Sequence, residues 1–373
     1  MDNLFNTSSE ECEPSKISLK NKNPFLKKKH QKTNISSHCT EIPLMFGKQY
    51  SCEHAQLPIE EENLYEDSVI FGITNFSNSC WLAVCLQILV LCSEFVDSVL
   101  KLDTEYETKT DACMVKILAL FIKAYQTGIR TQILDQARAV KDLLTVKDSN
   151  YKGTSFQDVQ ESLLFILSLL SDSVEKNLII QPTTFPNNTV FNPVKKYFEF
   201  EIIQVYRCKN CKLETRTVKS DQMHYCEVTP DSSSLNELLI TSFQYDIEKR
   251  CECSVHNTKF TCRLGFKKLP KLFVVGLKRA IFDKKTIKLK TEIKLSHLLK
   301  LATTNKEKKI YKLNAVVNHI GESPTSGHYI GFFYRRFNKN WFRVNDGVVN
   351  QCDLSDVFEE SKNNGYLFVY RQA

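Results

Sequence analysis

The segment that decides the fold spans residues 71–92 and reads FGITNFSNSCWLAVCLQILVLC. A polar, turn-prone approach ends at Cys80, and a strongly apolar run follows. This pattern predicts a buried helix over 80–100 with Cys80 at its N-terminus, where the helix dipole stabilises a thiolate. A buried thiol that only packs is the alternative, because free cysteine is among the most buried residue types. Residues elsewhere in the chain must decide between the two.

The overall composition is that of a globular protein. The chain has 373 residues, of which 42% are hydrophobic and 25% charged, with a net charge of +7. This mild positive charge does not demand nucleic acid, and the longest apolar run (80–92) is too short to span a bilayer. We therefore expect neither a nucleic-acid nor a membrane partner. Fourteen scattered cysteines without a secretory signal predict a reducing compartment, cytoplasmic or nuclear.

The chain divides into an extension and a globular domain. Residues 1–66 are rich in Ser, Asn, Lys and Glu and lack an apolar period, which predicts disorder. Seven lysines lie between Lys16 and Lys32, so this stretch could instead be a nuclear-localisation or docking patch. Residues 69–373 are expected to form the folded domain.

The globular part changes character near residue 186. Before it, apolar positions at helical spacing predict helices over 112–127, 132–146 and 155–170, with Ser155 as the N-cap of the third. After it, short β-branched and aromatic runs separated by turns predict strands. A helical half followed by a strand-rich half indicates an α+β fold.

Two further residues complete a candidate catalytic group with Cys80. His328 lies in SPTSGHYIGFFYRR, just before a predicted strand over 329–335. A hairpin through the turn FNKN would return Asn345 and Asp346 alongside it, where either accepts the Nδ1 proton of the imidazole. The side-chain amide of Asn75 could donate a hydrogen bond to an oxyanion. Taken singly, His328 could be a surface or core histidine, and the NDG sequence only a turn.

A metal site is predicted in the strand-rich half. The sequence CKNC occupies 208–211 and CECSVH occupies 251–256. Two such pairs at the tips of β-ribbons form a tetrahedral zinc site. We expect Cys208, Cys211 and Cys253 as ligands, with either Cys251 or His256 as the fourth. A closed shell of four ligands makes this zinc structural, and reduced cysteines without metal are the alternative.

These motifs together resemble the ubiquitin-specific proteases. GITNFSNSCWLAVCLQIL resembles the family's cysteine box, G-L-x-N-L-G-N-T-C-Y-M-N-x-x-L-Q. YKLNAVVNHIGESPTSGHYIGFF, WFRVNDGVV and the terminal GYLFVY resemble its histidine box. FQDVQESL resembles its Q-D-x-x-E-x-L segment, and LPKLFVVGLKRA its L-P-x-x-L-x-x-x-L-K-R-F segment. The matches follow the family's order from Gly72 to about Tyr370.

The resemblance implies catalytic roles for the residues that match. Cys80 would be the nucleophile and His328 the general base. Asn345 would orient the histidine, and the adjacent Asp346 would assist. Asn75 would donate to the oxyanion. No cofactor would take part in the chemistry.

It also implies substrate-binding residues. In the segment that begins at Gln157, Asp158 and Glu161 would grip an arginine of ubiquitin's C-terminal tail, and their spacing of three residues predicts a shared helix face. Gly327 and Tyr329 would line a narrow tunnel for the Gly-Gly end of that tail.

The fold implied is the papain-like hand: a helical thumb over about 69–185, zinc-ribbon β fingers over about 195–266, and a β-sheet palm from the remainder. The function implied is a cysteine-type deubiquitinase that cleaves after ubiquitin's terminal glycine. Its partners would be ubiquitin and ubiquitinated proteins, and an activator protein is compatible with the pattern.

Several positions depart from the family pattern. Ser77 replaces a glycine, Ser79 a threonine, Trp81 a tyrosine, Ala83 an asparagine and Ala280 a phenylalanine. None of these departures removes a catalytic group. They leave two alternatives open: an inactive ubiquitin-binding pseudoenzyme, and a protease for a ubiquitin-like modifier.

Overall fold

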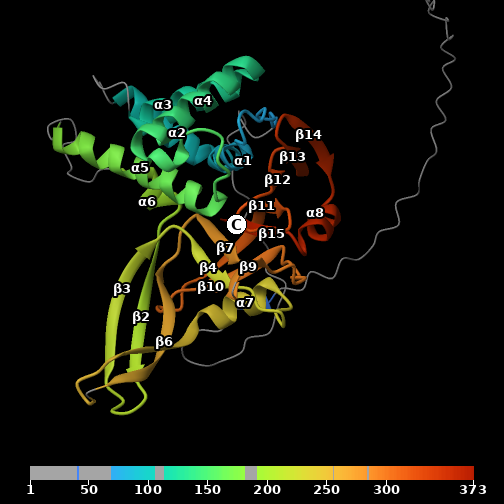
Figure 1. The fold of residues 1–373 in the computed structure, drawn as a ribbon. Helices are drawn as coiled ribbons and strands as arrows, with labels where there is room; N and C mark the ends of the chain where they lie inside the picture. Colours follow the sequence, from blue (N-terminus) through green and yellow to red (C-terminus); the bar gives the residue numbers. More distant parts are fainter. Residues whose placement is uncertain (1–39, 42–68, 106–112, 181–190, 255, 284) are drawn as a thin grey trace, which may run out of the picture. The chain divides into compact units, whose positions relative to one another are not determined.

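The computed structural model describes residues 40–41, 69–105, 113–180, 191–254, 256–283 and 285–373. All of them belong to the compact unit His38–Ala373. The extension expected to be disordered, including its lysine-rich stretch, lies outside the described residues except for β1 (Thr40–Glu41), which pairs in parallel with β10 (Leu298–Ala302). Figure 1 shows the described elements as coloured ribbons.

The N-terminal half is helical, as predicted, and forms the thumb. Its elements are α1 (Cys80–Leu89), α2 (Ser93–Glu105), α3 (Met114–Thr127), α4 (Arg130–Lys147), the 3₁₀ turn η1 (Ser149–Tyr151), α5 (Val159–Ile180) and α6 (Pro193–Tyr197). α3 and α4 confirm the helices predicted over 112–127 and 132–146. In Figure 1 these helices lie together on one side of the β-rich part.

The single helix predicted over 80–100 is wrong, because the chain bends by 92° between α1 and α2. All ten residues of α1 are buried, so this helix is apolar on every face. Its one amide, Gln87, donates to the Phe71 carbonyl at 2.5 Å and accepts from the Tyr125 hydroxyl at 2.8 Å. Among the described residues no single helix is long and apolar enough to cross a membrane; the α1–α2 pair passes only when taken together.

The palm is a nine-stranded sheet in the order β14-β13-β12-β11-β15-β7-β4, with β10 on β11 and β1 on β10. Its strands are β4 (His224–Glu227), β7 (Leu272–Lys278), β10 (Leu298–Ala302), β11 (Lys308–Ile320), β12 (His328–Arg335), β13 (Asn340–Asn345), β14 (Val348–Cys352) and β15 (Gly365–Gln372). The hairpin of β12 and β13 matches the predicted return through the FNKN turn. Two capped helices, α7 (Leu235–Ser242) and α8 (Leu354–Ser361), accompany the sheet.

The fingers are a separate four-stranded antiparallel sheet in the order β3-β2-β6-β5. Its strands are β2 (Phe200–Cys208), β3 (Glu214–Asp221), β5 (Gln244–Arg250) and β6 (Asn257–Lys268). A two-stranded hairpin of β8 (Ala280–Asp283) and β9 (Lys285–Lys288) follows β7. The fold is therefore the α+β papain-like hand of thumb, palm and fingers.

Two hydrophobic cores lie on opposite faces of the palm. One contains α1 and the other thumb helices together with one face of the sheet, including Tyr329 and Phe333 of β12. The other contains the opposite face, including Ile330 and Phe332, with α7 and the base of the fingers. Because residues of β12 alternate between both cores, this strand is fixed on each side.

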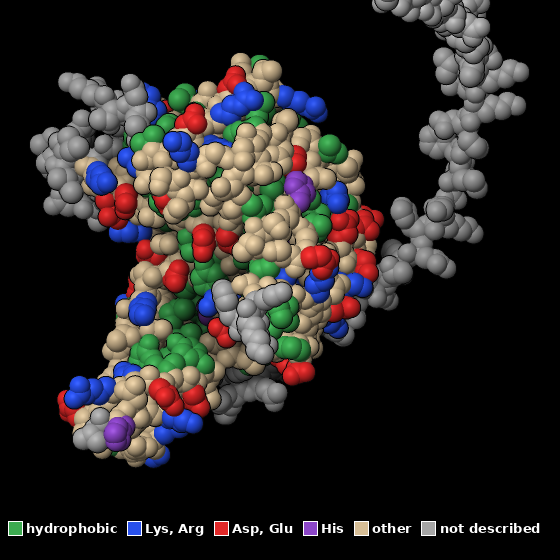
Figure 2. Space-filling model, viewed as in Figure 1, with side chains coloured by type: hydrophobic (Ala, Val, Ile, Leu, Met, Phe, Trp, Pro, Cys, Tyr) green, Lys and Arg blue, Asp and Glu red, His purple; other side chains and the backbone are tan. Residues whose placement is uncertain are grey.

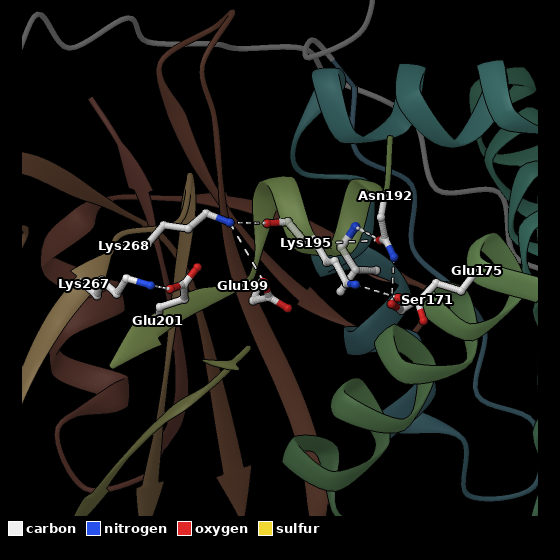
Figure 3. Close-up of polar contacts among 9 residues, drawn as sticks. Ser171, Glu175, Asn192, Lys195, Glu199, Glu201, Lys267 and Lys268 are labelled. Carbon is white, nitrogen blue, oxygen red and sulfur yellow. Dashed lines mark hydrogen bonds and ion pairs between the residues drawn. The ribbon is translucent and has the colours of Figure 1, made fainter. Parts of the chain in front are cut away.

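Polar contacts join the thumb to the fingers where α5, α6, β2 and β6 meet (Figure 3). Asn192 caps α6 and donates to the Ser171 hydroxyl at 2.8 Å. The Lys268 ammonium donates to the backbone carbonyl of Lys195 at 3.2 Å. Ion pairs at this junction join Lys195 to Glu175, Lys268 to Glu199, and Lys267 to Glu201. Of these contacts, the bond from Lys268 at the end of β6 to the Lys195 carbonyl of α6 joins the fingers to the helical thumb.

Candidate active site

Cys80 is the first residue of α1, at the N-terminal end predicted from the sequence, and only 2% of it is exposed. The loop before it is held by its own side chains. The Ser79 hydroxyl accepts from the Phe76 backbone N–H at 2.9 Å, and the Asn75 side-chain oxygen accepts from the Ser79 N–H at 3.0 Å. These bonds fix the approach to the thiol.

The tip of this loop is left-handed at two successive residues, Ser77 (φ 58°) and Asn78 (φ 57°). Neighbouring elements support it. The Lys141 ammonium of α4 donates to the Ser77 carbonyl at 3.4 Å and to the Gly153 carbonyl at 2.7 Å. The Asn78 amide donates to the Thr154 carbonyl at 2.9 Å. Lys141 and the 153–154 backbone were not singled out from the sequence, since nothing local connects them to the loop.

His328, the first residue of β12, lies between Cys80 and Asn345. Its Nε2 is 2.7 Å from the Asn345 Oδ1, and the Cys80 side chain lies close enough to act on the pKa of its ring. The sequence prediction that Nδ1 faces the orienting residue is therefore wrong: Nε2 does. Register brings Asn345 near the start of β12, but the rotation of the imidazole ring decides which of its two nitrogens faces Asn345, and the sequence does not specify that rotation.

The environment of His328 favours the protonated imidazole. The interaction with the Cys80 side chain is the largest cause; with the bond to Asn345 and the charge of Asp346, it outweighs burial and raises the pKa of His328 to about 9. The Asp346 carboxylate lies 3.7 Å from Nε2. An imidazolium beside a cysteine stabilises the thiolate, which is the reactive form.

Asp346 also connects the two halves of the site. Its carboxylate accepts from the Asn75 amide at 3.2 Å, and its carbonyl accepts from the Ile73 N–H at 3.0 Å. The backbones of Gly72 and Gly347 touch here: a Cβ on Gly72 would lie 2.5 Å from the Gly347 carbonyl carbon. The turn between β13 and β14 thus docks on the cysteine loop and brings the thumb and palm residues together.

The predicted shared helix face of Asp158 and Glu161 is wrong. α5 begins at Val159, and Asp158 precedes it as a cap, replacing the expected Ser155. Its Oδ1 accepts from the N–H groups of Gln160 (2.7 Å) and Glu161 (3.1 Å), and its Oδ2 from the Tyr366 hydroxyl (2.5 Å). A carboxylate here satisfies the free N–H groups of the first turn, which decides where the helix begins.

The remaining predicted substrate residues differ in accessibility. Glu161 is exposed, and Gln157 donates from its side chain to the Asn150 carbonyl at 2.8 Å. Gly327 immediately precedes His328 and is exposed. Tyr329 is only 1% exposed and stacks on Phe156 at a centroid distance of 5.1 Å. In this structure Tyr329 is a core residue, so it lines no open tunnel.

Tyr366 is a site residue that the sequence did not indicate. It lies in the GYLFVY segment and reaches Asp158, 208 positions away, through its hydroxyl. The alternation of that strand could have placed Tyr366 on the thumb-facing side, but not opposite a particular carboxylate.

The four cysteines Cys208, Cys211, Cys251 and Cys253 lie at the tip of the fingers. Their sulfurs are all within 4.8 Å of one another, with Cys208–Cys253 and Cys211–Cys251 at 3.7 Å. Four sulfurs around a tetrahedral zinc, at about 2.3 Å each, lie roughly 3.8 Å apart, so the spacing fits this metal. His256 is not part of the group. The geometry therefore selects Cys251 over His256 as the fourth candidate ligand.

A hand with a cysteine at a helix N-terminus opposite a histidine and an asparagine on the palm defines a papain-like cysteine hydrolase. Residues 71–370 match the family model described as ubiquitin carboxyl-terminal hydrolase, and the chain belongs to that family.

Two curated proteins of known name are similar to this chain over most of its length. It is 26% identical to ubiquitin carboxyl-terminal hydrolase 48 of Gallus gallus, over 80% of this chain but only 32% of that protein. It is 24% identical to ubiquitin carboxyl-terminal hydrolase 4 of Arabidopsis thaliana, over 80% of this chain and 92% of that one. This chain thus spans about a third of the length of the chicken relative.

Solved structures with the same fold include two of the Ubp8 subunit of the SAGA DUB module, which also contains Sgf11, Sus1 and Sgf73. One, bound to monoubiquitin, has a TM-score of 0.68, 20% identity and coverage of 85% of this chain and 72% of that one. The other, bound to ubiquitin aldehyde, has a TM-score of 0.68, 21% identity and coverage of 84% and 71%. At these identities the likeness shows the fold.

Proposed function

We propose that this protein is a deubiquitinating cysteine protease that cleaves the isopeptide or peptide bond after ubiquitin's terminal glycine through Cys80, His328 and Asn345. The observation that carries the proposal is the placement of the His328 ring close to Cys80, with Asn345 Oδ1 on its other side at 2.7 Å from Nε2. Family membership adds the substrate class.

The geometry supports the following mechanism. The Cys80 thiolate, beside the His328 imidazolium, attacks the carbonyl carbon of the terminal glycine. His328 then gives its proton to the leaving lysine amine, and a thioester to Cys80 remains. A water molecule deprotonated by His328 hydrolyses the thioester and restores the thiol. Asn345 holds the ring in the plane that serves both transfers.

Asn75 is proposed as an oxyanion donor. Its amide group carries two N–H bonds, and one of them points to Asp346. The other remains for the substrate oxygen, together with backbone N–H groups at the start of α1. Asp346 would act by holding Asn75 in place.

The fingers and thumb are proposed to hold ubiquitin. Figure 2 shows hydrophobic side chains gathered in a hollow between the thumb and the finger strands, with acidic side chains along its upper edge. Glu161, which is exposed, and Asp158 would pair with an arginine of the ubiquitin tail, as charge-assisted bonds between guanidinium and carboxylate allow. Gly327 would border the path of the Gly-Gly end.

The four fingertip cysteines are proposed to bind a structural zinc. Phe260 packs with Cys208 and Cys251 in a small buried cluster, and Tyr206 and Ile247 pack against it. Zinc would join the turn after β2 to the turn before β6 and would take no part in hydrolysis. The Ubp8 structures contain further subunits. By analogy, we propose that a partner protein could activate hydrolysis by this chain.

Cleavage assays test the proposal. The purified chain and its Cys80→Ala variant are incubated with isopeptide-linked ubiquitin and, separately, with conjugates of ubiquitin-like modifiers. We expect release of ubiquitin by the unmodified chain and none by the variant. Faster cleavage of another modifier would overturn the ubiquitin assignment, and binding of ubiquitin without cleavage would favour a pseudoenzyme.

A further inference from the structure

Lys288 is a buried cation close to the site that the mechanism above does not use. It is the last residue of β9, and 7% of it is exposed. Its ammonium donates to two backbone carbonyls, those of His319 at 2.7 Å and Gly321 at 2.9 Å. Burying a lysine is unfavourable, so such a residue is normally retained for what it binds.

The two carbonyls lie on either side of Ile320, the last residue of β11. Ile320 is the register partner of His328. The turn that joins β11 to β12 also closes tightly on itself: a Cβ on Gly327 would meet the Ile320 carbonyl oxygen and would lie 2.5 Å from the His319 Nε2. Whatever fixes the end of β11 therefore fixes Gly327 and the start of His328.

The base of Lys288 is itself held firmly. Arg279, 2% exposed, donates to the carbonyls of Leu289 (3.2 Å) and Thr291 (2.8 Å), just after Lys288, and to Gly365 of β15 (2.8 Å). The Leu289 N–H donates back to the Arg279 carbonyl at 2.6 Å. Lys288 thus extends from a segment anchored to the palm.

The surroundings of Lys288 make its hydrogen bonds to the two carbonyls sensitive to pH. Burial is the main cause that lowers the pKa of Lys288 to about 8; Arg279 and Lys290 lower it further, while Glu322 raises it. His319 is neutral at physiological pH, because burial and then the charge of Lys288 lower its pKa to about 4. The ammonium form is present below about pH 8 and is lost above it.

We propose that Lys288 is a positioning residue that clamps the end of β11 and thereby holds Gly327 and His328 in place for catalysis. This inference rests on the proposed function, because it concerns the same site. Lys288 touches neither the reacting atoms nor the substrate in this account; it acts through the turn between β11 and β12.

The test compares Lys288→Met, which keeps the length of the side chain without its donors, with Lys288→Arg, which keeps charge and donors. Lys290→Met is the matched control, because Lys290 is exposed and pairs with the Glu322 carboxylate of the same turn. The readouts are kcat and KM for a fluorogenic ubiquitin substrate, melting temperature, and the pH profile of kcat.

We expect Lys288→Met to lower kcat at least tenfold with KM within about threefold and a melting temperature close to that of the unmodified chain. Lys290→Met should stay within twofold. In the unmodified chain kcat should fall from about pH 8, whereas Lys288→Arg should retain more than half its kcat at pH 8 and lose activity only at a higher pH. Unchanged kcat in Lys288→Met, or an equal loss in Lys290→Met, would overturn the proposal.

Two further arms keep the test decisive. If Lys288→Met does not fold, the test rests on the pH above which kcat falls. The clamp is overturned if this pH is the same in Lys288→Arg as in the unmodified chain. If the unmodified chain does not cleave ubiquitin, the proposed function fails, and the clamp is tested by alkylation of Cys80 with iodoacetamide, followed by peptide mass spectrometry. Slower alkylation in Lys288→Met supports the clamp, and an unchanged rate overturns it.

Discussion

Ser77 occupies a left-handed conformation that suits glycine, and it stands where the family pattern has glycine. The left-handed region is unfavourable for a residue with a Cβ by about 1–2 kcal/mol. The departure visible in the sequence therefore has a physical consequence: the loop before Cys80 carries backbone strain. Hydrogen bonds from Lys141 and Asn78 on either side help to hold this conformation.

Replacing Ser77 by glycine should therefore stabilise the protein. The relief of strain exceeds the added entropy of the unfolded chain, for a net gain of about 0.5–1 kcal/mol, or roughly 1–3 °C in melting temperature for a domain of this size. Thermal denaturation measures it. Asn78→Gly is the control, because asparagine tolerates this conformation and its bond to Thr154 would be lost. A lower melting temperature for Ser77→Gly would contradict the explanation.

His328 predicts a second alkaline limit of activity, above the one at about pH 8 that is proposed for Lys288. Because its folded-state pKa, about 9, lies above the ordinary value near 6.5, the charged ring stabilises the folded site fully below about pH 6.5 and loses this effect as pH rises through 9. The alkaline limb of kcat/KM should shift to lower pH in Asn345→Ala, which removes a hydrogen bond that raises the pKa. An unshifted limb would show that Asn345 does not act on the ring.

At the scale of elements, the docking of the β13–β14 turn on the cysteine loop is the critical contact. Gly72→Ala should force the two backbones apart, since no flexible side chain can yield there. A displacement of about 1 Å lowers kcat/KM on the order of 100-fold. Gly347→Ala is the matched control: its nearest neighbour is the Thr74 hydroxyl at 3.3 Å, which can rotate away. Equal activities of the two variants would refute this role.

The fingers supply a second prediction at this scale. Cys251→Ser should abolish stoichiometric zinc and lower the melting temperature, because metal binding in such sites stabilises the fold. His256→Gln should retain both, since His256 lies outside the four-cysteine group. Elemental analysis and thermal denaturation decide. If His256→Gln loses zinc while Cys251→Ser keeps it, the fourth ligand is His256 and the assignment is reversed. If the unmodified chain contains no zinc, the site is refuted.

Elements were predictable where periodicity was long and caps were clear. α3 and α4 follow their apolar spacing, and the β12–β13 hairpin follows its turn. The break after Leu89 was not predictable, because residues on both sides of it are apolar and buried. α5 begins at Val159, with Asp158 and not Ser155 as its cap, because Asp158 is also fixed by Tyr366, a contact distant in sequence. α6, α7 and α8 span five to eight residues, too short for a period to show.

For the whole molecule, the order of sequence motifs carried more information than composition. The α+β class followed from helical and strand patterns, whereas the hand followed from the resemblance. Cys80, His328 and Asn345 were predicted as a group from the sequence, and the structure places His328 beside Asn345. The ring nitrogen that faces Asn345 depends on the rotation of the imidazole, which the sequence does not specify. The roles of Lys288 and Lys141 could not be predicted, because their partners are backbone carbonyls, which every residue carries.

The most direct test of the central claim is the reaction of the isolated chain with ubiquitin carrying a C-terminal electrophile. The account predicts a covalent adduct at Cys80 in the unmodified chain, none in Cys80→Ala, and slower formation in His328→Ala. Intact-mass spectrometry measures the adduct, and peptide mapping locates it. No adduct in the unmodified chain, or an adduct that persists in Cys80→Ala, would contradict the assignment of Cys80 as the nucleophile of a ubiquitin hydrolase.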